Sequence, residues 1–545
     1  MPESAWPTSS LYGLFSRQAR ENPDREALSY YNFRYSYGEL LEKVDAVAAI
    51  LSGRIGPGEI VPVIAPTTPE VIACLYALNK IGAVPSLVDI RFKPDRIKMI
   101  CDRTQCKLVI VSSLVVKEIA SLIDQLSVTE VVVIKGSESM PDVAASWFSF
   151  EENREETDRM VREDPRFVFW TDFMEDAASS REEISSFAWR DSAPAFHFQT
   201  SGTSGGAKSV LLTNRNAFDA IRNTFVNLND AQAGDAVLCI MPIFSFYGFL
   251  TSVCLPLSYG MSVIIFPFIS HASFLKLIAK CKPQHVFSAP SHWENVENKK
   301  NDGLRFDFLK TPFVAGDILL PSYEKAINAY LNRHGCSYSI VKAYGMTETG
   351  GAVAIANGNH PRKYNLGFSG KPFPGLDIIV AGDEICVKSD RRFLGYFEDS
   401  KATDDLIRRR ADGSAWIHTG DVGRFDTDGN LYVIDRLKRM IVRYDGSKVF
   451  PVEIENALIE HPSVAQCAVV PMDDPEHPFG YAPKAFVVLR EGEKGKVDES
   501  DLRNYCQDRL PCNMVPSKIV FLDALPLNSN GKVEIMALGS CRKEK

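Results

Sequence analysis

The 545-residue chain lacks the paired cysteines of a disulfide framework or a zinc site. Its 12 cysteines are scattered, with no C-x-x-C pair and no cysteine–histidine spacing typical of a metal-binding module. Patterned cysteines stabilise small secreted folds, whereas scattered free thiols are typical of reducing compartments. We therefore expect a cytoplasmic protein with free thiols.

The chain also lacks an excess of positive charge. Lys and Arg number 61 against 69 Asp and Glu, which gives a formal net charge of −8. A chain with this charge is not attracted to nucleic acids or anionic lipid surfaces, so we expect neither as a partner. The N-terminus, MPESAWP, has neither the basic start nor the apolar core of a signal peptide.

One long stretch, 236–275, lacks charged residues altogether. It is long enough to cross a bilayer, but Pro242, Pro256 and Pro267 interrupt it. Proline removes a backbone donor and bends or ends a helix. We therefore predict buried strands and one short helix inside a large core, and no membrane span.

The chain is longer than one hydrophobic core accommodates, which predicts a large domain and at least one more. Residues 10–130 alternate between helical and strand-like patterns. The predicted elements are helices at 36–51 and 69–82, and strands at 60–65, 108–111 and 131–134. This alternation predicts a sheet covered by helices on both faces. The acidic segment 136–192 has little aliphatic periodicity, and we expect a surface excursion of loops and short helices there.

The strongest local pattern lies at 199–213, which reads QTSGTSGGAKSVLLT. Glycines let backbone N–H groups turn toward phosphate oxygens, hydroxyl side chains add short donors, and Lys208 adds a positive charge. A flexible polar linker is the simplest alternative, but the apolar run 210–212 follows at once and favours a strand. The pattern therefore predicts a loop that binds a polyanion.

A P-loop is the second alternative, because 202–209 reads GTSGGAKS against the pattern G-x-x-x-x-G-K-[ST]. Ala207 stands where the second glycine of that pattern belongs. A P-loop also leads into a helix whose N-terminus holds the phosphates, whereas strand-like residues follow here. We therefore favour a glycine-rich loop between two strands.

Three further strings accompany the loop: YGMTETGG at 344–351, HTGDVG at 418–423 and LPLNSNGKV at 525–533. Together they resemble the motifs of the adenylate-forming, AMP-binding enzymes of the acyl- and aryl-CoA synthetase type, over residues 10–535. The resemblance implies an α/β fold. Its implied parts are a large N-terminal domain (1–435) of helix-covered sheets plus a small barrel-like sheet, a hinge (436–440), and a small mobile α+β C-terminal domain (441–545).

The resemblance also implies a role for each matching residue. Contacts with the ATP phosphates are implied for Thr200, Ser201, Gly202, Thr203, Ser204, Gly205 and Lys208, with adenine for Gly316, Asp317, Tyr344 and Gly345, and with ribose for Asp421 and Arg436. Thr347 and Glu348 would hold Mg²⁺, because hard oxygen ligands suit this ion. Lys532 would bridge the substrate carboxylate and the phosphate oxygens in the transition state. His418 is expected to be a strand residue without a catalytic role.

The implied substrate and thiol sites follow in the same way. The acyl pocket would be formed by Ser245, Phe246, Tyr247, Met346 and Gly350, the pivot by Lys438, and the contacts with coenzyme A by Arg443, Gly446 and Lys448. Ser245 stands where related enzymes usually have His. No Asp lies near the aromatic run to hold an α-amino group, so we expect an apolar acyl or aryl acid.

The implied function is an ATP-dependent carboxylate–CoA ligase that uses ATP, Mg²⁺ and coenzyme A on a small carboxylic acid. Three alternatives remain open. In the first alternative, the acyl group passes to the phosphopantetheine of an acyl or peptidyl carrier protein. In the second the adenylate is oxidised, as in luciferases, and in the third the chain is a non-catalytic nucleotide-binding protein.

Overall fold

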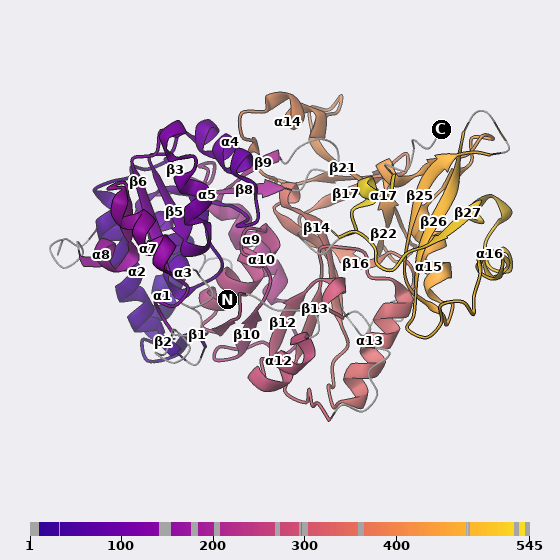
Figure 1. Cartoon of the computed structure of the whole chain (residues 1–545), viewed down its shortest axis with the longest axis horizontal. Coiled ribbons are helices and arrows are strands. Elements are labelled where there is room, and N and C mark those ends of the chain that lie inside the picture. The colour runs from indigo at the N-terminus through magenta and orange to yellow at the C-terminus, as the bar shows by residue number, and fades with distance from the viewer. Residues whose placement is uncertain are drawn as a thin grey trace.

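A computed structural model describes residues 10–31, 33–140, 154–175, 184–200, 208–267, 273–293, 296, 303–357, 364–475, 477, 480–527 and 533–539. It confirms the α/β class: two large sheets with helices form the N-terminal part, and a smaller sheet with its own helices forms the C-terminal part (Figure 1). The boundaries 435 and 441 of the predicted domains stay predictions.

The predicted helices at 36–51 and 69–82 are confirmed as α2 (Tyr37–Ser52) and α3 (Pro69–Ile81). Ser36 caps α2 by accepting a hydrogen bond from the backbone N–H of Glu39, whose side chain bonds back to Ser36. Proline at the first position starts α3, and Gly82 ends it at φ 87°, a left-handed conformation that favours glycine. Local capping chemistry thus explains both boundaries.

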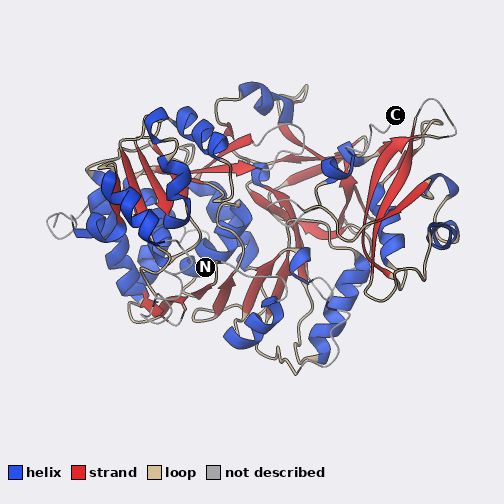
Figure 2. Ribbon diagram, in the orientation of Figure 1, coloured by secondary structure: helices blue, strands red, loops and turns tan. Residues whose placement is uncertain are grey.

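The first sheet has eight strands in the order β19-β9-β8-β4-β3-β5-β6-β7. Their bounds are Gly395–Tyr396, Lys208–Leu212, Phe196–Thr200, Val84–Leu87, Ile60–Ile64, Leu108–Ser112, Glu130–Ile134 and Phe167–Phe169. The strands from β8 to β7 are parallel, and β9 and β19 are antiparallel additions at one end. Helices lie around this sheet (Figure 2), including α1 (Leu11–Glu21), α4 (Pro94–Thr104) and α5 (Val116–Ala120).

Part of the segment 136–192 corrects the sequence-based expectation. The structure places α7 (Arg154–Glu163), β7 and α8 (Trp170–Glu175) there, and β7 extends the sheet by parallel pairing with β6. Trp170 and Phe173 are only 4% and 1% exposed. The segment therefore belongs partly to the core and is not only a surface excursion. Its buried residues are aromatic, so the lack of aliphatic periodicity did not reveal them.

The second sheet has 14 strands, in the order β17-β18-β21-β22-β16-β15-β14-β13-β12-β10-β11-β1-β2 with β20 beside β21. The strands from β14 to β1 are parallel, and the rest are antiparallel. The bounds are β1 Glu26–Tyr30, β2 Phe33–Ser36, β10 Ala236–Cys239, β11 Ser262–Ile265, β12 His285–Ser288, β13 Thr311–Val314, β14 Val341–Met346, β15 Gly351–Ala356, β16 Phe368–Pro372, β17 Asp377–Ala381, β18 Glu384–Lys388, β20 Ile407–Arg409, β21 Ala415–Phe425 and β22 Leu431–Arg436.

The described parts of the uncharged stretch, 236–267 and 273–275, lie in this region and are largely buried, as predicted. Strands β10 and β11 flank a helical run of α10 (Phe246–Phe249), a π-helical turn (Leu250–Cys254) and α11 (Leu255–Ser258). Further helices of this part are α9 (Asn214–Phe225), α12 (Phe274–Cys281), α13 (Pro321–Arg333) and α14 (Ser400–Leu406). Among the described residues, no helix combines the length and the apolar character needed to cross a membrane.

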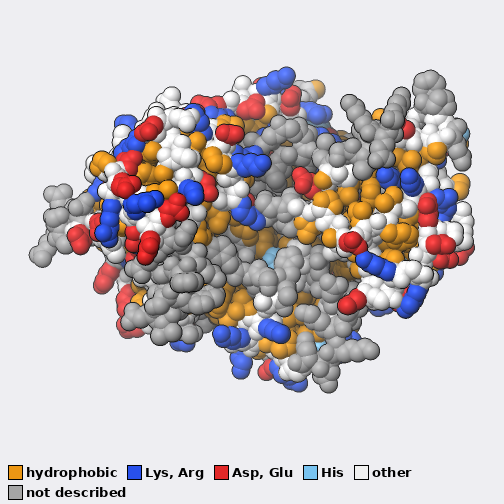
Figure 3. Space-filling model, viewed as in Figure 1, with side chains coloured by type: hydrophobic (Ala, Val, Ile, Leu, Met, Phe, Trp, Pro, Cys, Tyr) orange, Lys and Arg blue, Asp and Glu red, His pale blue; other side chains and the backbone are white. Residues whose placement is uncertain are grey.

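The C-terminal part contains β23 (Ile441–Val442), β24 (Lys448–Val449), α15 (Pro451–Ile459), β25 (Val464–Asp473), β26 (Tyr481–Leu489), α16 (Glu499–Gln507), β27 (Lys518–Phe521) and α17 (Ile535–Gly539). The sheet β25-β26-β27 packs with α15 and α16 around a separate core that includes Ile454, Val487 and Leu502. It meets the N-terminal part at α13, where Tyr323 Oη donates to the Ala465 carbonyl at 2.8 Å. Charged side chains of both signs are interspersed on the visible face of the molecule (Figure 3).

His197 on β8 is a buried ionisable group close in sequence to the glycine-rich stretch. It is 1% exposed, and its Nδ1 lies 2.7 Å from the Ser86 hydroxyl of β4. Burial, assisted by the charge of Arg103, lowers the pKa of His197 from 6.5 to about 4. The folded chain therefore excludes a proton that the unfolded chain accepts in this pH range.

We expect the free energy of unfolding to fall as the pH drops from 6.5 to about 4, with His197 contributing up to roughly 3 kcal/mol. Above pH 6.5 both states are neutral at this site and the contribution is complete. His197→Gln should lose less stability between pH 7 and pH 5, measured as urea midpoints. His477→Gln, at the surface, is the control; equal pH dependence in wild type and His197→Gln would contradict the prediction.

Candidate active site

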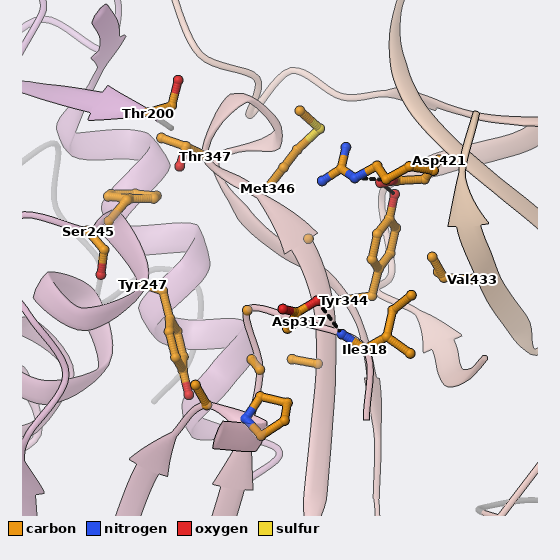
Figure 4. Close-up of a pocket in the computed structure, with 18 of the residues that line it drawn as sticks. Thr200, Ser245, Tyr247, Asp317, Ile318, Tyr344, Met346, Thr347, Asp421 and Val433 are labelled. Carbon is orange, nitrogen blue, oxygen red and sulfur yellow. Dashed lines mark hydrogen bonds and ion pairs between the residues drawn. The ribbon is translucent and has the colours of Figure 1, made fainter. Parts of the chain in front are cut away.

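One cavity of about 2260 Å³ lies where the two large sheets and the C-terminal part meet. We refer to it as the central cavity. From the N-terminal part it is lined by segments around β8, β13, β14, α10 and β21, and from the C-terminal part by residues 466–468, 525, 527 and 533–535. Figure 4 shows lining side chains from separate segments of the N-terminal part, among them Thr200, Tyr247, Tyr344 and Asp421. The site is therefore shared by both parts of the chain.

The glycine-rich stretch lies between two antiparallel strands, as predicted. Thr200 ends β8, Lys208 starts β9, and the two residues pair directly across the strands. Thr200 Oγ1 donates to the Lys208 carbonyl at 3.3 Å. Both residues line the central cavity, whereas the predicted phosphate contacts Ser201, Gly202, Thr203, Ser204 and Gly205 lie outside the described residues. The two ends of the loop thus open on the cavity.

A tyrosine that the sequence did not reveal connects Lys208 to Glu348. The Lys208 ammonium lies 4.5 Å from the centre of the Tyr396 ring, and Tyr396 Oη donates to Glu348 Oε1 at 2.8 Å. Burial and the neighbouring carboxylate raise the pKa of Tyr396, so its hydroxyl stays protonated and remains a donor.

Glu348 and Thr347 lie in a 3₁₀ turn, Thr347–Thr349, directly after β14. Strand β14 continues its pairing with β15 to Met346. Both residues line the central cavity, and Glu348 is 7% exposed. A carboxylate and a hydroxyl on one turn are the hard oxygen ligands that Mg²⁺ prefers, so the residues present fit this ion.

Asp421 is the centre of a hydrogen-bonded group at the other end of the cavity. Tyr344 Oη donates to Asp421 Oδ2 at 2.6 Å, and Arg436 Nε lies 2.8 Å from Oδ1 (Figure 4). Burial, reinforced by the charge of Asp421, raises the pKa of Tyr344 well above its ordinary value, so the phenol stays a donor. Asp421 and Arg436 lie directly opposite each other on the paired strands β21 and β22.

The turn before Asp421 is fixed by Glu384. This carboxylate accepts from the Gly420 N–H at 2.9 Å and contacts His418 Nδ1 at 2.7 Å. Gly420 has φ 71°, a conformation that favours glycine. His418 lies on a strand, as expected, and its position beside Glu384 supports the turn that presents Asp421.

Glu384, Cys386 and His418 also bring ligand atoms within 4.8 Å of one another. Sequence spacing did not indicate this group, because its members come from the two paired strands β18 and β21. Burial, followed by the charge of Glu384, raises the pKa of the Cys386 thiol. Since Glu384 already bonds Gly420 and His418, we interpret the group as support for the turn.

The predicted adenine contacts lie together on the cavity wall. Gly316 follows β13 at φ 92°, and Asp317 accepts from the Ile318 N–H at 2.9 Å. Tyr344 and Gly345 line the same cavity. Val433, which the sequence did not single out, lies beside them in Figure 4.

The aromatic run forms another wall. Ser245 caps α10 by accepting from the Gly248 N–H at 3.0 Å and donating to the Pro242 carbonyl at 2.8 Å. Phe246, Tyr247 and Met346 line the cavity with it. The Ser245 hydroxyl therefore stabilises the turn that starts α10.

Gly350 and Gly351 differ in their surroundings. A Cβ on Gly350 would lie 2.3 Å from the Arg391 carbonyl, whereas one on Gly351 would lie 3.1 Å from Ala220 Cβ and 3.8 Å from Leu250 and Phe246. Gly351, but not Gly350, is among the residues that line the central cavity. Gly351 is thus a wall residue that the sequence-based set did not include.

The predicted hinge residue lines the central cavity, whereas the predicted contacts with coenzyme A lie outside its lining. Lys438 and Arg436 line the central cavity, whereas Arg443 lies 3.5 Å from Asp474 and Lys448 pairs with Asp383, both away from the cavity lining. Gly446, at φ 80°, belongs to the same turn as Lys448.

Lys532 lies outside the described residues. On either side of it, Leu527 and Val533 form an isolated bridge and line the central cavity.

Comparisons with known proteins bear directly on this site. The family model of the AMP-binding enzyme matches residues 15–397, and that of the AMP-binding enzyme C-terminal domain matches residues 453–532. The chain belongs to the AMP-binding enzyme family. A 2-succinylbenzoate–CoA ligase of Bacillus thuringiensis is 26% identical over 94% of each chain, and 4-coumarate–CoA ligase CCL1 of Humulus lupulus is 30% identical over 61% of this chain and 62% of its own.

Solved structures share the fold. The anthranilate CoA ligase AuaEII, solved with anthranoyl-AMP, superposes with a TM-score of 0.83 at 20% identity, covering 100% of this chain and 99% of its own. ATP-bound MatB of Rhodopseudomonas palustris gives 0.81 at 21% identity, covering 98% and 99%. This AMP-binding family member is an enzyme of the acyl- or aryl-CoA ligase group, an AMP-forming acid–thiol ligase, and CoA ligases of the family use ATP, Mg²⁺ and coenzyme A.

Tyr396→Phe should lower ATP-dependent pyrophosphate release by about tenfold, because a hydrogen bond to a charged group contributes roughly 1.5–3 kcal/mol and Glu348 would lose its donor. The Mg²⁺ concentration for half-maximal rate should rise as well. Tyr481→Phe, on an exposed ring, is the matched control. An unchanged rate and unchanged Mg²⁺ dependence in Tyr396→Phe would show that the bond has no part in the site.

Proposed function

We propose that the chain is an ATP-dependent carboxylate–CoA ligase for an apolar acyl or aryl acid. One observation carries the proposal: a single cavity is lined by Thr200 and Lys208 at the ends of the glycine-rich loop, by Thr347 and Glu348, and by the Tyr344–Asp421–Arg436 group. Polyanion, cation and sugar ligands thus have separate places in one enclosure. The residues that flank Lys532 face the same cavity.

In the first step a carboxylate oxygen attacks the α-phosphorus of ATP, the bond to the β-phosphate oxygen breaks, and pyrophosphate leaves. Charge neutralisation and positioning dominate such phosphoryl chemistry. Lys208 and the glycine-rich loop would hold the leaving phosphates, Asp421 would accept the ribose hydroxyls, and Tyr344 would stack on adenine.

Thr347 and Glu348 would hold Mg²⁺, which when bound neutralises charge on the phosphate oxygens. Tyr396 holds the Glu348 carboxylate in place. Lys532 would place its ammonium between the substrate carboxylate and the α-phosphate, where negative charge develops.

In the second step the sulfur of a thiol attacks the acyl carbon, the bond to AMP breaks, and the thiol proton passes to solvent. Coenzyme A is the favoured thiol, because the relatives are named as CoA ligases. A carrier-protein phosphopantetheine remains the alternative that the assay below separates.

The acid class follows from the wall around α10. Phe198, Ala220, Phe246 and Leu250 line that end of the cavity, and these side chains are apolar. Apolar walls favour an acyl or aryl group over a charged one. The 2-succinylbenzoate and 4-coumarate ligases are named after acids that contain an aromatic ring, so such acids should be tested first.

Lys532→Ala should reduce pyrophosphate release by at least about 100-fold, because the loss of one preorganised charge at a developing oxyanion costs roughly 3–4 kcal/mol. Binding of ATP should change little. The assay uses ATP, Mg²⁺ and a panel of carboxylic acids, with and without coenzyme A. Lys494→Ala, an exposed lysine paired with Asp523, is the control. Wild-type rates in Lys532→Ala would remove the residue from the mechanism.

The same assay separates the alternatives. Turnover that needs coenzyme A supports the ligase. Adenylate that stays bound until a carrier protein is added supports the loading enzyme, and no pyrophosphate with any acid supports a non-catalytic nucleotide-binding protein.

Lys438→Pro should spare adenylate formation and block thioester formation, because a proline at the pivot restricts rotation of the backbone. The two half-reactions are measured separately, as pyrophosphate release without thiol and as thioester formation from a supplied adenylate. Equal loss in both would count against a pivot at this residue.

A further inference from the structure

A buried carboxylate lies at the start of the hinge and contacts both of its sides. Asp435, in β22, is 1% exposed. Its Oδ1 accepts from the Arg436 N–H at 2.7 Å and lies 3.3 Å from Arg439 Nη1. Its Oδ2 accepts from the Val452 N–H at 3.1 Å. Val452 is in the first turn of α15, so the carboxylate reaches directly from the N-terminal part to the first helix of the C-terminal part.

Arg439 extends this connection. Its Nη2 contacts Glu455 Oε1, and the same oxygen accepts from the Val469 N–H at 2.8 Å. Glu455 lies on α15 and Val469 on β25. Asp435, Arg439 and Glu455 therefore join the end of β22 to the first helix and the first strand of the C-terminal part.

The energetic consequence comes from burial. Desolvation raises the pKa of the Asp435 carboxyl, and the neighbouring Arg439 acts in the opposite direction. A buried charge that loses its partner is strongly destabilised. The contacts across the hinge thus compensate for the burial of Asp435, and an orientation without them would leave that carboxylate without its partners.

We propose that Asp435 and Arg439 form a latch that holds the C-terminal part in the orientation seen here, in which residues 533–535 line the central cavity. This orientation serves adenylate formation, and the latch opens before the thioester step. Rotation about Lys438 separates Asp435 from Val452, because the two lie on opposite sides of that residue. The proposal rests on the proposed function.

Among the described residues, further contacts between the parts include Tyr323 with Ala465 and Lys448 with Asp383, neither of which involves the residues next to the pivot. Asp435, Arg439, Val452 and Glu455 all line the central cavity. A ligand in the central cavity can therefore contact the residues of the latch. Asp435 and Arg439 are positioning residues in this scheme.

The test measures the two half-reactions of Asp435→Ala separately. The first is pyrophosphate release without thiol, and the second is thioester formation from coenzyme A and a synthetic adenylate of the same acid. We expect the first rate to fall at least tenfold and the second to stay equal or rise. Asp435→Asn, which keeps an acceptor for Val452 but loses the charge that pairs with Arg439, should lie between wild type and Asp435→Ala.

Two controls sharpen the result. Glu460→Ala alters an exposed carboxylate at the end of the same helix and should change neither rate. The losses of the first rate in Asp435→Ala and Arg439→Ala should not add in the double variant, since residues that act as a unit are coupled. Equal loss of both half-reactions in Asp435→Ala, or additive losses in the double variant, would overturn the latch.

A distance measurement tests the latch without catalysis. Cys512 is the exposed cysteine among those described, so spin labels on it and on Lys401→Cys, with Cys541→Ser, report the separation of the two parts by double electron–electron resonance. We expect Asp435→Ala to add a second distance population, and an unchanged distribution would overturn the proposal. A wild type that forms no adenylate with any acid refutes the proposed function instead, and the distance measurement still decides the latch.

Discussion

The carboxylate of Asp421 is the contact on which the arrangement of the site depends. It accepts a hydrogen bond from Tyr344 of β14 and pairs with Arg436 of β22, and the turn before it is held by Glu384 of β18. A carboxylate in a buried position needs such partners, because desolvation without them costs several kcal/mol. The requirement to satisfy one charge therefore fixes the relative positions of β14, β21 and β22 at this end of the cavity.

Features encoded within a short stretch could be predicted from the sequence. The periodicity of apolar residues located α2 and α3, and the glycines and hydroxyl residues beside Lys208 indicated a loop between strands. Each depends on interactions between neighbours along the chain or across one hairpin. These same strings carried the resemblance that the family match then established.

Features that depend on long-range contact could not be predicted in this way. Tyr396 touches Glu348 only because β19 pairs with β9, and Glu384 meets His418 only because β18 pairs with β21. The strand β7 was missed for a related reason, since it is only three residues long and its place in the sheet is set by parallel pairing with β6. Pairing partners are chosen by the whole fold, and a local pattern does not record them.

The cavity has walls from both parts of the chain, and this has a thermodynamic consequence. A molecule held there contacts residues 344–348 on one side and 533–535 on the other, so it is itself part of the contact between them. A ligand that binds this arrangement of the two parts more tightly than any other shifts the equilibrium toward it. The free energy of the shift equals the difference between the two binding free energies. Bound substrates therefore stabilise the contact between the N-terminal and C-terminal parts. Their conversion to products changes the strength of that contact.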